Sequence, residues 1–270
     1  MKILSRLYIA LIILFLYAPV AVMIVFSFNS SSSVWVFSGF STRWYEGLAN
    51  DTTMLTALEH TLIIAVSSAV ISTVLGTAAA VGITAIRRKM SQKIVMSVTQ
   101  IPMMNADIVT GISLMLLFIF FGKLIGLNES LGFATVLIAH ITFNLPYVIL
   151  NVMPKLKQMD ASLTDAAMDL GCTPLQAFFQ VTLHEIMPGV VSGAIMAFTM
   201  SLDDFVISYF VTGLDFITLP VEIYSYTKKP IQPKIYAMFT LLFLLIFVLM
   251  TAMNLIQLAA DKKKVAARGK

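Results

Sequence analysis

Six long apolar runs divide this sequence and constrain its fold more than any other feature. They cover approximately residues 7–28, 59–86, 94–121, 131–153, 189–211 and 235–258. Each run can cross a bilayer as a helix, which takes about 20 residues. Short segments rich in glycine, proline, serine and charge separate them. We therefore expect an all-α, polytopic membrane protein with a single transmembrane domain over residues 1–270.

The composition supports this class and excludes several others. Hydrophobic residues make up 59% of the chain and charged residues only 12%, so a soluble domain would expose too much apolar surface. The basic residues form short clusters beside the apolar runs, which is not the pattern of a nucleic-acid binding surface. The single cysteine, Cys172, excludes an intrachain disulfide.

The distribution of Lys and Arg predicts the orientation in the membrane. If the runs alternate in direction, 13 of the 18 Lys and Arg residues flank one side, in the two termini and in the loops at 87–93 and 154–188. The other five flank the opposite side. Since positive flanks stay inside, we expect both termini in the cytoplasm of a bacterial plasma membrane.

Small residues recur every four positions in the second run. Ser68, Ser72, Gly76 and Ala80 share one helical face. Such a face allows another helix to approach closely. We interpret it as a packing surface within a helix bundle.

Three carboxylates interrupt the apolar runs. Asp203 and Asp204 lie in the 189–211 run and Asp107 in the 94–121 run. Counting from the run starts, at 1.5 Å per residue, places all three at similar depth, with Asn144 within about a turn of it. A charged residue at the centre of a membrane helix costs about 2.5–3.5 kcal/mol on insertion scales. The acids are therefore expected to face a bundle interior or a wet cavity.

Helical geometry separates the two adjacent acids. Asp204 would share a face with Ser201 and Ser208, while Asp203 would line the edge of that stripe or pair with a neighbouring subunit. No basic residue lies in any apolar run at this depth, so we expect no salt bridge within the chain. Uncompensated acids favour a passing cation; protonated or structurally paired carboxyls are the alternative. His140 is interpreted as a hydrogen-bonded structural residue.

The loop at 154–188 carries signals for two short helices. Ser162 and Asp165 resemble a capping box before a helix at about 163–170, and Gly171 fits a left-handed C-terminal cap. Thr173 and Pro174 suit the start of a second helix, which is expected to end near Pro188. The sequence thus predicts helix, glycine, helix.

This loop resembles that of ATP-binding-cassette importer permeases. The family pattern is Glu-Ala-Ala, three residues, Gly, nine residues, then Ile-x-Leu-Pro. Here it corresponds to Asp165-Ala166-Ala167, Gly171 and Val181-Thr182-Leu183, with His184 in place of the Pro. The resemblance implies the fold of a type I importer transmembrane domain. It also implies that Asp165, Ala166, Ala167, Gly171 and Leu183 couple the chain to an ATPase subunit.

Two further stretches resemble the C-type permease of spermidine/putrescine importers. They are "FTMSLDDFVISYFVTG", residues 198–213, and "IPMMNADIVTGISL", residues 101–114. The resemblance implies polyamine import, with Asp107, Asn144, Ser201, Asp203, Asp204, Ser208 and Tyr209 as candidate pathway residues. Tyr209 would offer an aromatic face to an ammonium group.

The same resemblance implies the partners. They are a second, homologous permease, two ATP-binding subunits, an external polyamine-binding protein and membrane lipid. The chain has no Gly-x4-Gly-Lys-Ser/Thr phosphate loop, so ATP and Mg²⁺ are expected on the partner ATPase. We expect no cofactor, metal or catalytic residue in this chain.

Three alternatives remain open from the sequence. A related importer of ferric iron, thiamine, sulfate or phosphonate would have the same architecture. A stand-alone channel or carrier would not need the 154–188 loop. An intramembrane enzyme is disfavoured, because His184-Glu185 lacks the second His of a zinc-protease motif and Gly111-Ile112-Ser113 lacks the rest of a nucleophile elbow.

Overall fold

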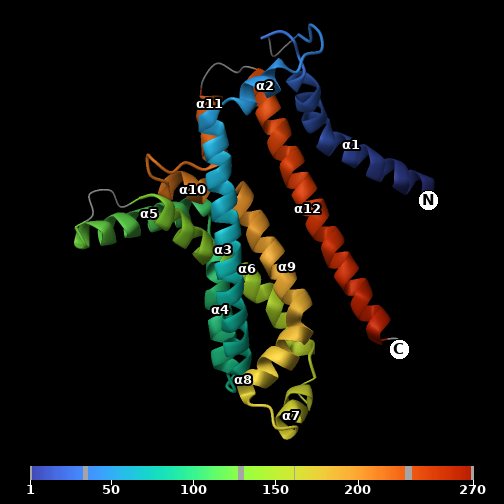
Figure 1. The fold of residues 1–270 in the computed structure, drawn as a ribbon, viewed down its shortest axis with the longest axis vertical. Helices are drawn as coiled ribbons and strands as arrows, with labels where there is room; N and C mark the ends of the chain where they lie inside the picture. Colours follow the sequence, from blue (N-terminus) through green and yellow to red (C-terminus); the bar gives the residue numbers. More distant parts are fainter. Residues whose placement is uncertain (1, 33–35, 127–130, 161, 229–232, 269–270) are drawn as a thin grey trace. The chain divides into compact units, whose positions relative to one another are not determined.

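The computed structural model describes residues 2–32, 36–126, 131–160, 162–228 and 233–268, almost entirely as helices (Figure 1). In chain order the elements are α1 (Lys2–Ser27), α2 (Arg43–Ala49), α3 (Thr52–Ala85), α4 (Lys89–Met104), α5 (Asp107–Leu124), α6 (Phe133–Gln158), α7 (Ser162–Asp169), α8 (Pro174–Ala177), the π-helix η1 (Phe178–Thr182), α9 (Leu183–Asp203), α10 (Val206–Val211), α11 (Leu219–Thr227) and α12 (Pro233–Arg268).

Among the described residues, six helical segments are long and apolar enough to span a membrane, as the sequence predicted. They are Arg6–Ser27, Thr52–Ala85, Asp107–Leu124, Phe133–Gln158, Pro174–Asp203 and Pro233–Ala252. The number and order of the expected spans are confirmed. Their ends differ most from expectation at the third and fifth spans, and both of these differences concern the candidate acids.

The third apolar run is not one helix, so the expectation of a continuous 94–121 span is wrong. α4 ends at Met104, Asn105 and Ala106 are extended, and α5 begins at Asp107. Pro102 lacks a backbone N–H and weakens the last turn of α4. Asp107 is therefore the first residue of a helix rather than a residue fourteen positions into one.

The fifth run is also interrupted, within the expected 189–211 helix. α9 ends at Asp203, Asp204 is extended at φ −64° and ψ 118°, and α10 begins at Val206. Towards its start, however, the same span is longer than expected. Pro174 to Asp203 is one helical segment of 30 residues that passes through η1 and Pro188.

The chain forms two compact units. Unit 1 comprises Met1–Leu58 and Leu219–Met250, and unit 2 comprises Glu59–Thr218 and Thr251–Lys270. Unit 2 contains the candidate acids and the helical loop. In its core α6 and α9 pack closely (Figure 1).

The small-residue face of α3 lies in this core, as predicted. A Cβ atom added at Gly76 would lie 2.7 Å from Val148 Cβ on α6. On α9, a Cβ added at Gly193 would lie 3.2 Å from Val148 Cα. Ser68, Ser72 and Ala80 are fully buried. Glycine at these crossings lets the three helices approach closely enough to bury the polar side chains one or two turns away.

In unit 1, α2, α11 and the facing ends of α3 and α12 surround a second apolar core. It contains Leu48, Met54, Leu219, Ile223 and Met238. Ser27 and Tyr45 share a hydrogen bond of 2.5 Å between their hydroxyls. The Trp44 indole donates to the Asn29 carbonyl at 2.7 Å. These bonds hold α2 against the end of α1.

Candidate functional site

The three predicted acids all lie at helix breaks. Asp107 begins α5 after the extended pair Asn105–Ala106, Asp203 ends α9, and Asp204 lies between α9 and α10. The side chains of Asp107 and Asp203 are exposed in the isolated chain. Inside a bilayer, non-helical backbone is tolerated where protein buries it or where it lines a wet cavity. We therefore expect protein or a wet cavity, and not lipid, beside any of these breaks that lies inside the bilayer.

Asp204 lies in a very different environment from Asp203. Its side chain is only 9% exposed. Oδ2 accepts a hydrogen bond from the Ser208 N–H at 2.8 Å, and Oδ1 is 3.3 Å from the Ile207 nitrogen. The carboxylate therefore caps the first turn of α10, where backbone N–H groups have no helical partner.

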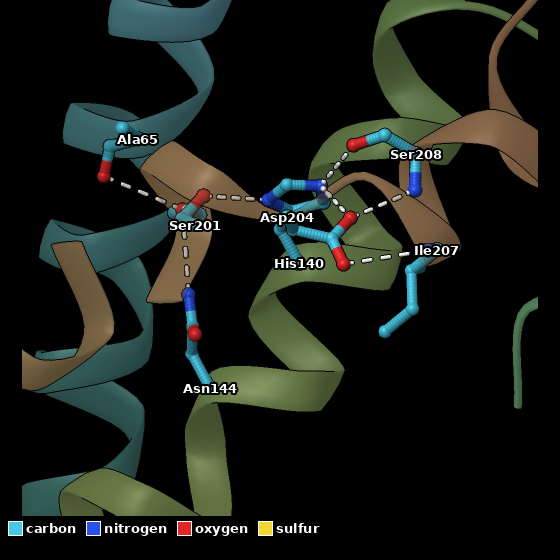
Figure 2. A network of polar contacts seen from close by, with 8 residues as sticks. Ala65, His140, Asn144, Ser201, Asp204, Ile207 and Ser208 are labelled. Carbon is cyan, nitrogen blue, oxygen red and sulfur yellow. Dashed lines mark hydrogen bonds and ion pairs between the residues drawn. The ribbon is translucent and has the colours of Figure 1, made fainter. Parts of the chain in front are cut away.

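His140 on α6 is the partner of this carboxylate (Figure 2). Its Nε2 lies 3.4 Å from Asp204 Oδ2 and 2.9 Å from Ser208 Oγ. On the other side of the ring, Nδ1 lies 2.5 Å from Ser201 Oγ. The expectation that Asp204 has no basic partner within the chain is wrong, because a histidine 64 positions away in sequence supplies one.

Ser201, Asp204 and Ser208 do meet, but not as a stripe on one helix. The helix breaks between Ser201 and Ser208, so the prediction that the three residues share one helical face is wrong. They meet because all three contact the His140 ring (Figure 2). As the sequence suggested, His140 is a hydrogen-bonded structural residue. Its spacing of four from Asn144, on one helical face, is the signal that could have placed it here.

The network continues from Ser201 into the bundle. Ser68 on α3 donates to Ser201 at 2.9 Å, and the Asn144 amide lies 3.5 Å from Ser68 Oγ. Ser68, Asn144 and Ser201 are at most 2% exposed. Oδ1 of Asn144 has no hydrogen-bond partner among the described residues. The polar chain thus links α3, α6, α9 and α10 through the interior of unit 2.

Two tyrosines lie near the acids. Tyr209 on α10 is 41% exposed, with its ring centroid 5.5 Å from that of Phe205. Tyr147 on α6 is within electrostatic range of the Asp107 carboxylate. The exposed members of the candidate set are therefore Asp107, Asp203 and Tyr209, whereas Asn144, Ser201 and Ser208 are buried and Asp204 nearly so.

The predicted helix–glycine–helix loop is present. Gly171 has φ +94° and closes α7 with a Schellman motif. In it, the Cys172 N–H donates to Ala167 O at 3.1 Å and the Gly171 N–H to Met168 O at 2.9 Å. α7 exposes Asp165 and Ala166 and buries Ala167.

The start of α8 is also as predicted. Thr173 Oγ1 accepts from the Gln176 N–H, Gln176 Oε1 accepts from the Thr173 N–H at 2.9 Å, and Pro174 is the first helical residue. This reciprocal capping fixes the entry of the chain into α8.

Two details of the loop prediction are wrong. Ser162 lies inside α7, and the residue that caps the helix is Asp160, whose Oδ1 accepts from the Ser162 N–H at 3.0 Å. This bond lowers the pKa of the exposed Asp160 carboxyl. The second helix does not end near Pro188, because buried Ile186 and Gly189 pack on both sides of that proline. Leu183, half-buried, is the first residue of α9.

No cluster of three or more His, Cys, Asp and Glu side chains in the described part of the chain could hold a metal ion.

Comparison with known sequences places this geometry among transport proteins. The sequence model of the family described as "Binding-protein-dependent transport system inner membrane component" matches residues 72–265. The match includes α4–α10, and with them every candidate residue named above.

Two curated relatives are similar over most of their length. The chain is 41% identical over 228 residues to the putrescine transport system permease protein PotI of Escherichia coli (strain K12), covering 84% of this chain and 81% of PotI. It is 39% identical over 250 residues to the spermidine/putrescine transport system permease protein PotC of the same strain, covering 93% and 91%.

Solved structures show the same fold at low sequence identity. A chain of a bacterial ABC transporter involved in the import of the acidic polysaccharide alginate superposes with a TM-score of 0.73 at 15% identity, over 95% of both chains. A chain of the MetNI methionine ABC transporter superposes with a TM-score of 0.62 at 18% identity, over 78% of this chain and 98% of that one. The predicted importer transmembrane fold is confirmed.

Proposed function

This chain belongs to the family of binding-protein-dependent transport system inner membrane components, and from that premise we propose that it is the permease subunit of an ATP-driven importer of putrescine and spermidine. The observation that carries the proposal is the identity of 39–41% to PotC and PotI over most of the chain. The chain is a transport subunit and not an enzyme. ATP and Mg²⁺ belong, on this proposal, to a partner ATPase.

The chemistry of the acids supports a polyamine as the transported solute. Polyamines carry several ammonium groups at neutral pH, and a carboxylate or an aromatic face binds each of them favourably. Exposed Asp107 and Asp203 offer the charges, and exposed Tyr209 offers a ring. We place these three at the pathway and assign Asn144, Ser201, Asp204 and Ser208 to the buried wall behind it.

The helical loop suits the transfer of force from an ATPase. Both its caps are closed by hydrogen bonds, and Thr164 on α7 is linked to Thr182 on η1 at 3.4 Å. A loop fixed in this way moves as a unit, whereas a slack one would absorb motion. We propose that Asp165, Ala166, Ala167, Gly171 and Leu183 form or support the surface that receives the ATPase.

The remaining assembly follows from the same premise. The proposed complex contains a second homologous permease, two ATP-binding subunits and an external polyamine-binding protein in the bacterial inner membrane. The excess of Lys and Arg in the termini and in the loops at 87–93 and 154–188 supports cytoplasmic termini. That orientation also puts α7 and α8 on the side where an ATPase works.

Uptake by the complete complex in proteoliposomes tests the function. We expect labelled putrescine or spermidine to enter only with ATP and the loaded binding protein. Asp107→Asn and Asp203→Asn should lower the rate at least tenfold, while Asp107→Glu and Asp203→Glu, which keep the charge, should retain much more of it. If the complex took up ferric iron or thiamine with ATP, and neither putrescine nor spermidine, the chain would be the permease of a related importer instead.

A further inference from the structure

His140 ties together both sides of the break that separates Asp203 from α10. Its ring contacts Ser201 at the end of α9 and Ser208 on α10, with Asp204 between them (Figure 2). The ring is 2% exposed. A buried histidine with partners on both nitrogens is oriented by its surroundings and in turn orients them.

The hydrogen bonds in the network have a direction. Ser68 Oγ lies within hydrogen-bond distance of both the Ala65 carbonyl and Ser201 Oγ. When it donates to Ser201, the Ser201 proton faces Nδ1 of His140. Nδ1 then accepts, and the ring proton lies on Nε2, which faces Asp204 and Ser208. In this arrangement the carboxylate of Asp204 faces an N–H group.

The two neighbouring acids are therefore not equivalent. Asp204 accepts from two backbone N–H groups and faces the His140 ring, and its side chain is 9% exposed. To reach a solute it would have to leave the first turn of α10 uncapped and His140 without its carboxylate, and unpaired buried groups are costly. The side chain of Asp203 is exposed and its carboxyl group is accessible.

We propose that His140 is a positioning residue: it holds Asp204 inside the bundle as the cap of α10, and this leaves Asp203 as the carboxylate of the pair that meets the transported cation. The inference deepens the proposed function, on which it rests, by dividing the roles of two adjacent acids. It also adds to the site a second buried residue of α6, one that touches no solute.

A double-mutant cycle on the purified complex tests the pairing without any transport assay. The variants are His140→Leu, Asp204→Asn and the double variant that combines them. The matched control is a second cycle in which Asp203→Asn replaces Asp204→Asn. His140→Leu should lower the thermal unfolding midpoint by leaving a buried carboxylate unpaired. That loss should shrink by at least half in the Asp204→Asn background and stay unchanged in the Asp203→Asn background.

The pairing would be overturned if His140→Leu lowered the unfolding midpoint equally in the unmodified, Asp204→Asn and Asp203→Asn complexes. It would also be overturned if the decrease depended on Asp203 instead of Asp204. Should His140→Leu fail to assemble, His140→Phe provides the same cycle, because it also removes both ring nitrogens. His140→Gln is a separate control, because its amide can still donate to Asp204. We expect His140→Gln to retain more stability than His140→Leu, which a purely steric role would not require.

Uptake kinetics test the division of roles. Asp203→Asn should impair uptake of labelled spermidine without lowering the unfolding midpoint, whereas Asp204→Asn should lower both. A fully active Asp203→Asn complex with an inactive but stable Asp204→Asn complex would reverse the assignment. If the unmodified complex imports no polyamine, the proposed function fails, but the unfolding cycle still decides whether His140 holds Asp204.

Discussion

Oδ2 of Asp51 lies 2.6 Å from Nζ of Lys234, so the residue before α3 is tied to the second residue of α12. The Tyr226 hydroxyl on α11 donates to the same carboxylate oxygen at 3.3 Å. Three elements of unit 1 that are up to 183 positions apart in sequence thus meet at one carboxylate. The hydrogen bond from Lys234 is the main reason that the pKa of Asp51 lies below its usual 3.8.

This pair predicts a pH dependence of stability with a definite sign. A carboxyl whose folded pKa is lowered stabilises the fold above its unfolded pKa and loses that contribution as the pH falls through the folded value. Asp51→Asn should therefore lower the unfolding free energy by about 1 kcal/mol at pH 7. This difference in unfolding free energy between Asp51→Asn and the unmodified protein should persist at pH 5 and disappear below about pH 3.8. Unfolding midpoints of both proteins across this range measure it; a deficit that grows towards acid pH would contradict it.

Two glycines on α3 should respond differently to the same substitution. A Cβ at Gly76 would lie 2.7 Å from two atoms of Val148, whereas a Cβ at Gly82 would meet nothing within 4 Å. We expect Gly76→Ala to destabilise unit 2 by about 1–3 kcal/mol through overpacking. Gly82→Ala should change stability by about 1 kcal/mol or less. Thermal unfolding of the two variants gives the comparison, and equal effects would mean that α3 and α6 do not approach closely.

The left-handed glycine of the loop should matter for coupling. Gly171 has φ +94° and Gly126 has φ +78°, with open space around both Cβ positions. Valine at either position carries the same backbone strain of about 1–2 kcal/mol. Gly171→Val should reduce polyamine taken up per ATP hydrolysed, while Gly126→Val should not, and Gly171→Asn should be tolerated. Loss of coupling in both valine variants would indicate general destabilisation.

Exposed apolar residues of the loop should contribute to ATPase binding. Leu170 after α7 is 88% exposed, and Leu214 after α10 is 92% exposed. On the proposed function only Leu170 faces the ATPase. Leu170→Asp should lower the amount of ATPase that co-purifies with the permease severalfold, and Leu214→Asp should leave it unchanged. Normal co-purification with Leu170→Asp would remove this leucine from the docking surface.

The sequence predicted those features that depend on neighbouring residues. Hydropathy gave six spans because each segment has to be apolar whatever surrounds it. The caps at Gly171 and Thr173 followed because their hydrogen bonds join residues at most five positions apart. The packing face of α3 was predictable because small residues recur every four positions along it.

The helix breaks left weaker local signals. Pro102 and Asn105 stand in the third run, and both disfavour helix, but an apolar run of that length conceals a gap of two residues. The apolar run around Asp204 predicts a charge within a continuous helix. A carboxylate there can equally cap a new helix, and the structure uses it in that way.

Contacts between segments that are distant in the sequence could not be predicted from it. His140 and Asp204 are brought together by the packing of α6 against α9, which no local pattern encodes. The continuation of the helix through Pro188 has the same origin, since buried Ile186 and Gly189 hold both sides of the proline against the bundle. Which of two adjacent acids is buried depends on that same packing.

Helix α9, from Leu183 to Asp203, acts geometrically as a lever. Its 21 residues extend over about 30 Å. A tilt of about 5° pivoting at the Leu183 end would move the Asp203 end sideways by about 3 Å. Small rotations at the capped loop thus become displacements of atomic size beside the acids.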